Sequence, residues 1–287
     1  MIIAIYGSRR QDAHLPALEA FLRSLDSAGH EVVMHPKLYN YLLQLIPGAL
    51  RCVRRVLPSA AEAGAQLCVS IGGDGTFLRT AQWIGAAATP IAGVNTGHLG
   101  YLTAMGIEGL AGLVPAFEAG LMRSHARSLI EVVAPGLPFS PYALNEVALL
   151  KSETAAMISV AATLDGVPLA DYRVDGLLVS TPTGSTAYNL SVGGPIVQPS
   201  APVWTVSPIA AHSLSMRPIV INDSCELTLT ATGRTPHVRL SMDGRGVQLD
   251  TPATVTLRRA PFDVHMLQGP DYGFASTLRH KLHWGED

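Results

Sequence analysis

The five residues Gly72-Gly73-Asp74-Gly75-Thr76 have the composition of a turn that holds phosphate. They follow an apolar run, Leu67–Ile71, and precede a helical pattern that includes Phe77 and Leu78. Glycines let backbone N–H groups approach an anion, and the start of a helix adds partial positive charge. Asp74 would repel a phosphate unless its carboxylate binds the accompanying cation or accepts a proton from the group that is phosphorylated. The simpler alternative is a tight strand-to-helix turn in which Asp74 caps the helix.

Two further polar segments interrupt apolar strands. Residues 175–188 begin as a strand and become a run of hydroxyl side chains broken by Pro182 and Gly184, which suits a phosphorylated or polyhydroxylated ligand. Asn145-Glu146 places an amide beside a carboxylate, a pair that can bind an adenine edge or ribose hydroxyls. The structural alternatives are a Ser/Thr-rich turn that caps a helix for the first segment and a solvent-facing bulge for the second.

The elements that must position these residues change in character near Arg127. Before it, apolar strands alternate with helical stretches, which predicts a parallel sheet covered by helices. After it, period-two runs and the hairpin signal Asp165-Gly166 predict an antiparallel, mainly β domain. The expected strands are Ile2–Tyr6, Val32–Met34, Leu67–Ile71, Pro90–Val94, Ala143–Leu150, Ile158–Leu164, Glu226–Thr232, His237–Met242 and Ala253–Leu257, and the expected helices are Leu15–Ala28, Thr76–Gly85, Ile107–Leu121 and Phe274–Trp284.

The predicted fold class is therefore α/β plus β. We expect a Rossmann-like α/β domain over residues 1–122, an antiparallel β-sandwich-like domain over 123–265, and a helical segment over 266–287 that packs back on either domain. In such parallel sheets ligands bind at the carboxyl ends of the strands, which is where Gly72–Thr76 lies.

Composition excludes several partners. The 287 residues are 48% hydrophobic and carry a formal net charge of -2, so a basic surface for nucleic acid is not expected. The three cysteines are far apart in sequence and form no zinc or disulfide pattern, which favours a reducing compartment. The apolar run at the N-terminus is too short for a membrane span and lacks the order of a secretory signal. We expect a cytoplasmic protein without nucleic-acid or membrane partners.

Taken together, the polar segments resemble the NAD kinase family over nearly the whole chain. Gly72–Thr76 matches the family's GGDGT, and Asp175–Pro195 reproduces its DG…STPTGSTAY…GGP almost unbroken. The GGDGT match is moderately specific, because lipid kinases and phosphofructokinases carry relatives of it, whereas the long match is highly specific. Further similarity lies in Gly93-Val94-Asn95, Gly97–Thr103, Leu144–Val147 and Ala211–Pro218.

The resemblance implies phosphorylation of the adenosine ribose 2′-hydroxyl of NAD by ATP or another phosphoryl donor, in a cleft between the two domains. It implies Mg²⁺ carried by the donor phosphates, without a direct protein ligand, and a homodimer or homotetramer. Asp74 would be the proton acceptor. The phosphate loop would consist of Gly72, Gly73, Gly75 and Thr76, and the candidates for phosphate contacts would be Arg79 and Arg173. The other residues implied to bind NAD, together with Asp74 and these two arginines, are Gly75, Asn145, Glu146, Asp175, Thr186, Ala187, Tyr188, Asn189, Leu190 and Ser191.

The chain departs from the family at several positions. Asp243-Gly244-Arg245 stands where many relatives have DGQ, so contacts of that Gln do not transfer to this chain. Thr96 and His98 stand where many members carry basic or amide residues, and we do not include them in the site. No P-loop lysine motif and no dinucleotide GxGxxG are present, which weighs against a dehydrogenase. The remaining alternatives are a diacylglycerol- or sphingosine-type lipid kinase and a non-catalytic NAD-binding regulator.

Overall fold

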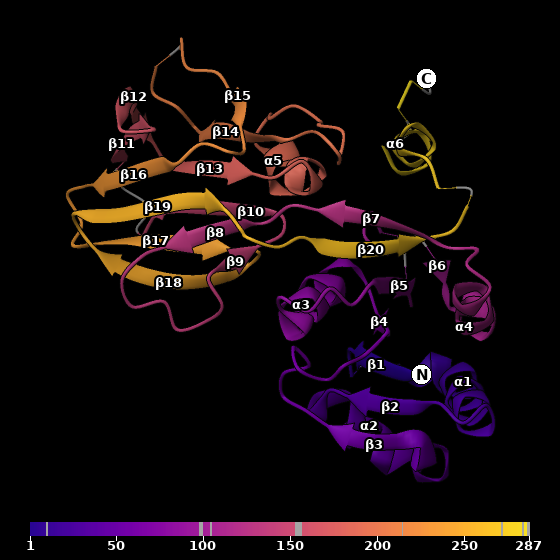
Figure 1. The fold of residues 1–287 in the computed structure, drawn as a ribbon. Helices are drawn as coiled ribbons and strands as arrows, with labels where there is room; N and C mark the ends of the chain where they lie inside the picture. The colour runs from indigo at the N-terminus through magenta and orange to yellow at the C-terminus, as the bar shows by residue number, and fades with distance from the viewer. Residues whose placement is uncertain are drawn as a thin grey trace. The chain divides into compact units, whose positions relative to one another are not determined.

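A computed structural model describes residues 1–9, 11–97, 100–103, 105–152, 157–213, 215–270, 272–282 and 284–285. The chain forms two compact units. The first unit contains residues 1–126 and 264–287, and the second unit contains residues 127–263. In Figure 1 the first unit is coloured from indigo to magenta, and it also contains the yellow strand β20 (Val264–Gln268) near the C-terminus.

The first unit is built on a parallel sheet. Its strands lie in the order β3-β2-β1-β4-β5-β20-β7, with β6 also paired to β5. β1 pairs in parallel with β2 and β4, and β5 pairs in parallel with β4 and β20. In chain order its elements are β1 (Ile2–Gly7), η1 (Asp12–His14), α1 (Leu15–Ser27), β2 (Glu31–Met34), α2 (Pro36–Leu45), η2 (Pro47–Cys52), β3 (Val53–Val56), β4 (Leu67–Ile71), α3 (Asp74–Ile84), β5 (Ile91–Asn95), β6 (Met105–Gly106), η3 (Ile107–Gly109), α4 (Leu110–Glu118), β7 (Arg123–Arg127), β20 and α6 (Phe274–Leu282).

The central strands β4 and β5 are buried along their whole length, as expected of a sheet covered on both faces. Leu18, Leu22 and Leu25 project from one side of α1 into a core shared with β1, β4 and α4. α1 and α4 contact each other and lie on the same side of the sheet in Figure 1. The predicted parallel sheet with covering helices is confirmed.

The second unit consists of two antiparallel sheets. Their strand orders are β15-β14-β13-β10-β17-β18 and β12-β11-β16-β19-β8-β9. The elements are β8 (Ile130–Val133), β9 (Tyr142–Ala143), β10 (Glu146–Lys151), β11 (Ile158–Leu164), β12 (Val167–Val174), β13 (Gly176–Ser180), η4 (Thr183–Thr186), α5 (Tyr188–Ser191), β14 (Val203–Ile209), β15 (Ile219–Asn222), β16 (Leu227–Thr232), β17 (His237–Met242), β18 (Arg245–Asp250) and β19 (Ala253–Arg259).

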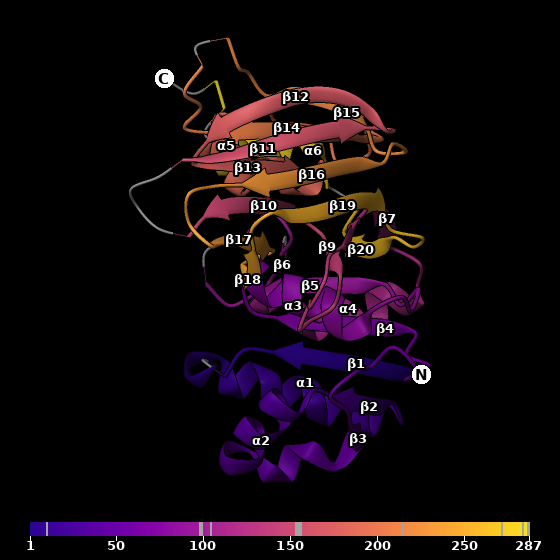
Figure 2. The ribbon, with the colours of Figure 1, turned by 90° about the vertical axis from the view of Figure 1, so that its left-hand side faces the viewer.

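Alternate residues of both sheets share one core, in which Trp204 is fully buried. This arrangement confirms the predicted antiparallel, sandwich-like β domain. The Asp165-Gly166 hairpin is also as predicted: both residues have positive φ, 49° and 77°, as a tight two-residue turn requires. Figure 2 shows its two strands, β11 and β12, side by side.

The interruption at Asn145-Glu146 has a topological cause. β9 pairs with β8 in one sheet, whereas β10 pairs with β13 and β17 in the other. The chain therefore passes from one sheet to the other at Leu144-Asn145. Along the described residues, no helix is both long enough and apolar enough to span a lipid bilayer.

Candidate active site

The turn after β4 is shaped by Gly72. Its φ is 147°, and its N–H donates to the carbonyl of Val94 at 2.9 Å. A Cβ at this position would lie within 2.9 Å of Thr76 Cβ, so a larger residue would force the turn apart. α3 begins at Asp74, with Gly73 as its N-cap. The glycine turn thus lies at the carboxyl end of a central parallel strand, and it opens a helix as expected.

Asp74 does not cap its own helix. Its carboxylate reaches the loop after β5 and accepts four hydrogen bonds. The N–H of Tyr101 donates to Oδ2 at 2.7 Å. Oδ1 accepts from the N–H groups of Leu102 and Thr103, both at 3.1 Å, and from Thr103 Oγ1 at 2.9 Å. The capping alternative is therefore wrong for this aspartate, and Oδ2, with one donor, retains capacity to accept another.

The loop that holds Asp74 is itself fixed by small and polar residues. A Cβ on Gly100 would overlap the Asp74 carboxylate, so only glycine permits this approach. Asn95 Nδ2 donates to Thr103 Oγ1 at 2.7 Å, and Asn95 Oδ1 accepts from the N–H of Gly97 at 2.6 Å. The structure therefore joins two motifs that are separate in sequence, GGDGT and the GVN…GYLT segment. His98 and Leu99 of that segment lie outside the described residues.

Three further side chains surround this turn. Arg79 is exposed on α3, and its Nη2 donates to Thr76 Oγ1 at 3.3 Å. The Tyr101 hydroxyl is buried without a hydrogen-bond partner among the described residues, and burial together with the charge of Asp74 raises its pKa. The Lys281 amine on α6 is buried and likewise unpartnered within the described chain. Burial lowers the pKa of Lys281, while the negative charge of Asp74 raises it.

Tyr101 and Lys281 were not among the expected site residues. The aromatic residue stands within the GYLT motif, so its position was visible in the sequence. The lysine is a single residue in a short amphipathic helix far along the chain, and no spacing in the sequence relates it to Asp74.

In the second unit, Asn145 and Glu146 lie where the chain changes sheets. Both are largely buried, and Asn145 Oδ1 and Glu146 Oε2 have no hydrogen-bond partner among the described residues. Burial raises the pKa of Glu146 from 4.5 to about 7, helped by the charge of Asp243, while a backbone hydrogen bond from Tyr188 acts to lower it. These two buried oxygen atoms without partners can accept hydrogen bonds from a polar ligand.

The hydroxyl-rich segment packs directly on this turn. The N–H of Thr181 donates to the carbonyl of Asn145 at 2.9 Å, and Thr181 Oγ1 donates to the carbonyl of Leu144 at 2.6 Å. The backbone hydrogen bond from Tyr188 brings the start of α5 to Glu146. Two of the three segments singled out in the sequence, Asn145-Glu146 and Thr181–Tyr188, are therefore contiguous in the fold.

The hydroxyl and amide groups in this segment serve different purposes. Ser180, Thr181 and Ser185 are fully buried and bond backbone carbonyls, so they shape the turn. Asn189 is also fully buried: its Nδ2 donates to the carbonyl of Pro195, and its Oδ1 accepts from Ser207 Oγ. Thr186, Ala187 and Leu190 are partly exposed, and Tyr188 and Ser191 are exposed, so these five residues can reach a ligand.

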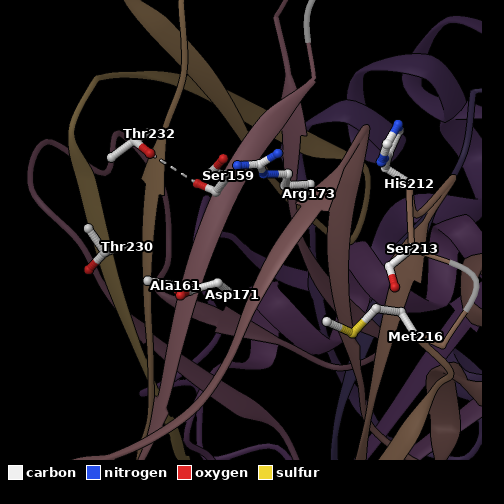
Figure 3. A pocket seen from close by; sticks show the side chains of 9 residues that line it. All are labelled: Ser159, Ala161, Asp171, Arg173, His212, Ser213, Met216, Thr230 and Thr232. Carbon is white, nitrogen blue, oxygen red and sulfur yellow. Dashed lines mark hydrogen bonds between the residues drawn. The ribbon is translucent and has the colours of Figure 1, made fainter.

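Arg173 and Asp175 are two positions apart on the chain but have different surroundings. Asp175 forms an ion pair with Lys151, with a distance of 2.7 Å between Oδ1 and Nζ. Arg173 lines an open pocket of about 530 Å³ on the outer face of β11, β12 and β16. Figure 3 shows Arg173 beside Ser159, with His212, Ser213 and Met216 on the opposite wall. Ala210, which precedes this wall, adopts a φ of 48°, uncommon for a residue with a side chain.

Arg245 has a structural role that the sequence left open. Its guanidinium donates to the carbonyls of Ser140 and Tyr142, at 3.1 and 2.8 Å, and lies 4.8 Å from the Phe139 ring centre. It therefore ties β18 to the segment that leads into the Asn145-Glu146 turn. The planar fork of donors in the guanidinium suits two carbonyls of one segment.

The fold is shared with kinases of pyridine nucleotides. The structure of the yeast NADH kinase complexed with NADH superposes with a TM-score of 0.89 and 22% sequence identity, covering 100% of this chain and 89% of that chain. The structure of an NAD kinase from Archaeoglobus fulgidus in complex with ATP has a TM-score of 0.72 and 28% identity, covering 94% of each chain. The fold of this chain, a parallel α/β unit and an antiparallel β unit, is thus similar to that of these two structures.

The sequence comparisons identify the family. The model of the ATP-NAD kinase N-terminal domain matches residues 9–122, and that of the C-terminal domain matches residues 144–268. The NAD kinase of Porphyromonas gingivalis is 40% identical over 99% of this chain and 98% of its own length. The NAD kinase of Bacteroides fragilis is 35% identical over 100% and 99%. The chain belongs to the NAD kinase family and is an enzyme, which confirms the resemblance and gives no support to a lipid kinase or a non-catalytic regulator.

Proposed function

We propose that this chain transfers the terminal phosphoryl group of ATP to the 2′-hydroxyl of the adenosine ribose of NAD, giving NADP and ADP. The observation that carries this proposal is the environment of Asp74. A carboxylate at the mouth of a glycine turn is held by four donors from one loop, and one of its oxygen atoms, Oδ2, keeps accepting capacity. Such a group orients a hydroxyl and accepts its proton.

The reaction transfers one phosphoryl group and one proton. A bond forms between ribose O2′ and the terminal phosphorus of the donor, and the bond from that phosphorus to the bridging oxygen breaks, releasing ADP. The proton of the 2′-hydroxyl passes to Asp74 Oδ2. The protein contributes alignment and charge rather than a covalent intermediate. Gly72, Gly73, Gly75 and Thr76 would supply backbone donors to the donor phosphates, and Arg79 and Lys281 would supply cations.

The divalent cation, Mg²⁺ in this proposal, enters with ATP as part of the donor substrate. Oδ1 of Asp74 already accepts three hydrogen bonds, and Oδ2 is assigned to the 2′-hydroxyl, so the donor phosphates would hold the cation. The positive charge of the bound cation would offset the negative charge on the donor phosphates. The described residues contain no group of three or more His, Cys, Asp or Glu side chains arranged for a metal.

The dinucleotide would bind through the second unit. Asn145 and Glu146 offer two buried oxygen atoms without partners, which suit ribose hydroxyls or the amino group of adenine. Tyr188 is 40% exposed and offers a flat apolar face to a base. We also assign to NAD binding Gly75, Arg173, Asp175, Thr186, Ala187, Asn189, Leu190 and Ser191.

The proposal also covers the localisation, the oligomeric state and the partners of the enzyme. We infer a cytoplasmic homodimer or homotetramer, without nucleic-acid or membrane partners. The net charge of -2 supports the absence of nucleic acid, because it provides no excess of cations for phosphate contacts.

The test is a coupled assay with purified protein, Mg²⁺, ATP and NAD, in which an NADP-specific dehydrogenase detects the product. Asp74→Asn should retain NAD binding and the fold while turnover falls by about two to four orders of magnitude, the usual contribution of a positioned acid or base. Full turnover in this variant would remove Asp74 from its role. Tight NAD binding by the unsubstituted protein without any NADP formation would overturn the proposed reaction.

A further inference from the structure

The tight turn between β17 and β18 places the Asp243 carboxylate against the Asn145-Glu146 turn. Asp243 and Gly244 have φ values of 47° and 77°, and Asp243 is half-buried. Its carboxylate accepts three successive backbone N–H groups: Leu144 to Oδ2 at 2.7 Å, and Asn145 and Glu146 to Oδ1 at 2.9 and 3.1 Å. In return, the Asp243 N–H donates to the carbonyl of Glu146 at 3.2 Å.

These hydrogen bonds lie where the chain changes sheets. At Leu144-Asn145 the segment has left β9 and has not yet entered β10, so no ladder supplies acceptors for its N–H groups. On the opposite side, Thr181 bonds the carbonyls of Leu144 and Asn145. A Cβ on Gly184 would overlap the backbone of Asn145, so the turn is enclosed on that side as well. Every backbone polar group of Leu144 and Asn145 is thereby paired, whereas the buried side-chain oxygens Asn145 Oδ1 and Glu146 Oε2 have no partner among the described residues and are available to a ligand.

We propose that Asp243 is a positioning residue for dinucleotide binding, which fixes the backbone of residues 144–146 so that the side chains of Asn145 and Glu146 are held toward the bound nucleotide. The inference rests on the proposed function, because it assigns the ligand of Asn145 and Glu146. It goes beyond that function by giving a role to an aspartate that touches no substrate.

The charge of Asp243 also affects the titration of Glu146, in addition to burial. The groups that face Glu146 are the Asp243 carboxylate from the β17–β18 turn and the backbone N–H of Tyr188 from α5, with Arg245 on β18 acting on Asp243. Burial raises the pKa of Asp243, while its three N–H donors and Arg245 act to lower it. Burial, with the charge of Asp243 added, raises the pKa of Glu146 to about 7. A ribose hydroxyl donates to a carboxylate, so NAD binding should tighten as pH rises through about 7.

The chain contains a matched control. Asp165 occupies the same position in the Asp165-Gly166 turn, with a φ of 49°. Its N–H donates to the carbonyl of Glu226 at 2.9 Å, and its Oδ1 accepts from the Glu226 N–H at 2.8 Å. It therefore reproduces the reciprocal pair of Asp243, but it is exposed and accepts one N–H rather than three.

The experiment compares Asp243→Asn with Asp165→Asn by calorimetric NAD titration from pH 5.5 to 8.5. An amide retains one acceptor oxygen and turns its NH₂ toward a backbone N–H, so Asp243→Asn should bind NAD about 10- to 100-fold more weakly. The pH midpoint of NAD binding should also move to lower pH, since the charge of Asp243 that adds to burial in raising the Glu146 pKa is removed. Asp165→Asn should match the unsubstituted protein in both respects. A weakened variant with an unchanged midpoint, or an unaltered affinity, would overturn the proposal.

Hydrogen exchange provides a readout that does not depend on NAD. In Asp243→Asn the amide protons of residues 144–146 should exchange at least tenfold faster, while those of Val147 and Leu149 in β10 keep their protection. Unchanged exchange at residues 144–146 would refute the positioning role even if NAD proved not to be the ligand. Failure of the unsubstituted protein to bind NAD, with faster exchange in the variant, would refute the proposed function and leave the backbone role intact.

Discussion

The raised pKa of Glu146 makes the stability of the ligand-free protein depend on pH. The folded protein holds this proton up to about pH 7, whereas the unfolded chain releases it near pH 4.5. The folded state therefore binds more protons between these values, and the free energy of unfolding falls as pH rises from 4.5 to about 7. Each pKa unit corresponds to about 1.4 kcal/mol, so the loss attributable to Glu146 is about 3 kcal/mol.

Glu146→Gln isolates this contribution because glutamine has the same shape and carries no titrating proton. The quantity to measure is the free energy of unfolding of the unsubstituted protein minus that of Glu146→Gln, from urea titrations at a series of pH values. Titrating groups that do not interact with Glu146 cancel in this difference. It should be largest near pH 4.5, fall by about 3 kcal/mol toward pH 7, and level off above that value.

The exposed residue Glu62 supplies the control. Glu62→Gln is a surface substitution and should alter stability by less than about 0.5 kcal/mol at any pH in the series. A difference for Glu146→Gln that stays constant from pH 4.5 to 8 would show that Glu146 is not protonated in the folded protein at neutral pH. The account of the paired carboxylates Glu146 and Asp243 would then be wrong.

Two further predictions concern the first unit. Gly100→Ala should lower turnover by at least about 100-fold, because the added Cβ would displace the Asp74 carboxylate. Gly112→Ala is the control and should retain full activity, since its added Cβ would meet open space. Equal activity of the two variants would show that the loop does not hold Asp74 as the base. Lys281→Met should raise the KM for ATP or lower kcat by about 10- to 100-fold in the coupled assay, because the cation is proposed to contact the phosphoryl donor. The affinity for NAD, measured by calorimetry, should not change. The exposed Lys37→Met is its control, and an effect of Lys281→Met confined to thermal stability would assign the lysine to packing alone.

Most of the architecture was accessible from local patterns. Continuous apolar runs predicted β4 and β5, and the Asp165-Gly166 signal predicted the β11–β12 hairpin. α2 (Pro36–Leu45) and β3 (Val53–Val56) were not predicted. The sequence held a signal for α2, since His35 and Pro36 form a capped start and Leu38 and Leu42 are one turn apart. β3 is a short edge strand with two arginines, which local propensity does not distinguish from a loop.

The sequence by itself determined the chemistry that is present: a carboxylate among glycines, a hydroxyl-rich turn, and an amide beside a glutamate. These types and spacings were sufficient to recognise the family. They could not show that Asp74 is held by residues 101–103, that Asp243 grips residues 144–146, or that the Lys281 amine is buried without a partner. Those relations join positions 27, 99 and more residues apart, and only the pairing of strands and the crossing between sheets brings them within hydrogen-bonding distance. A hydrogen bond depends on a few tenths of an ångström, and local sequence does not carry that information over such separations.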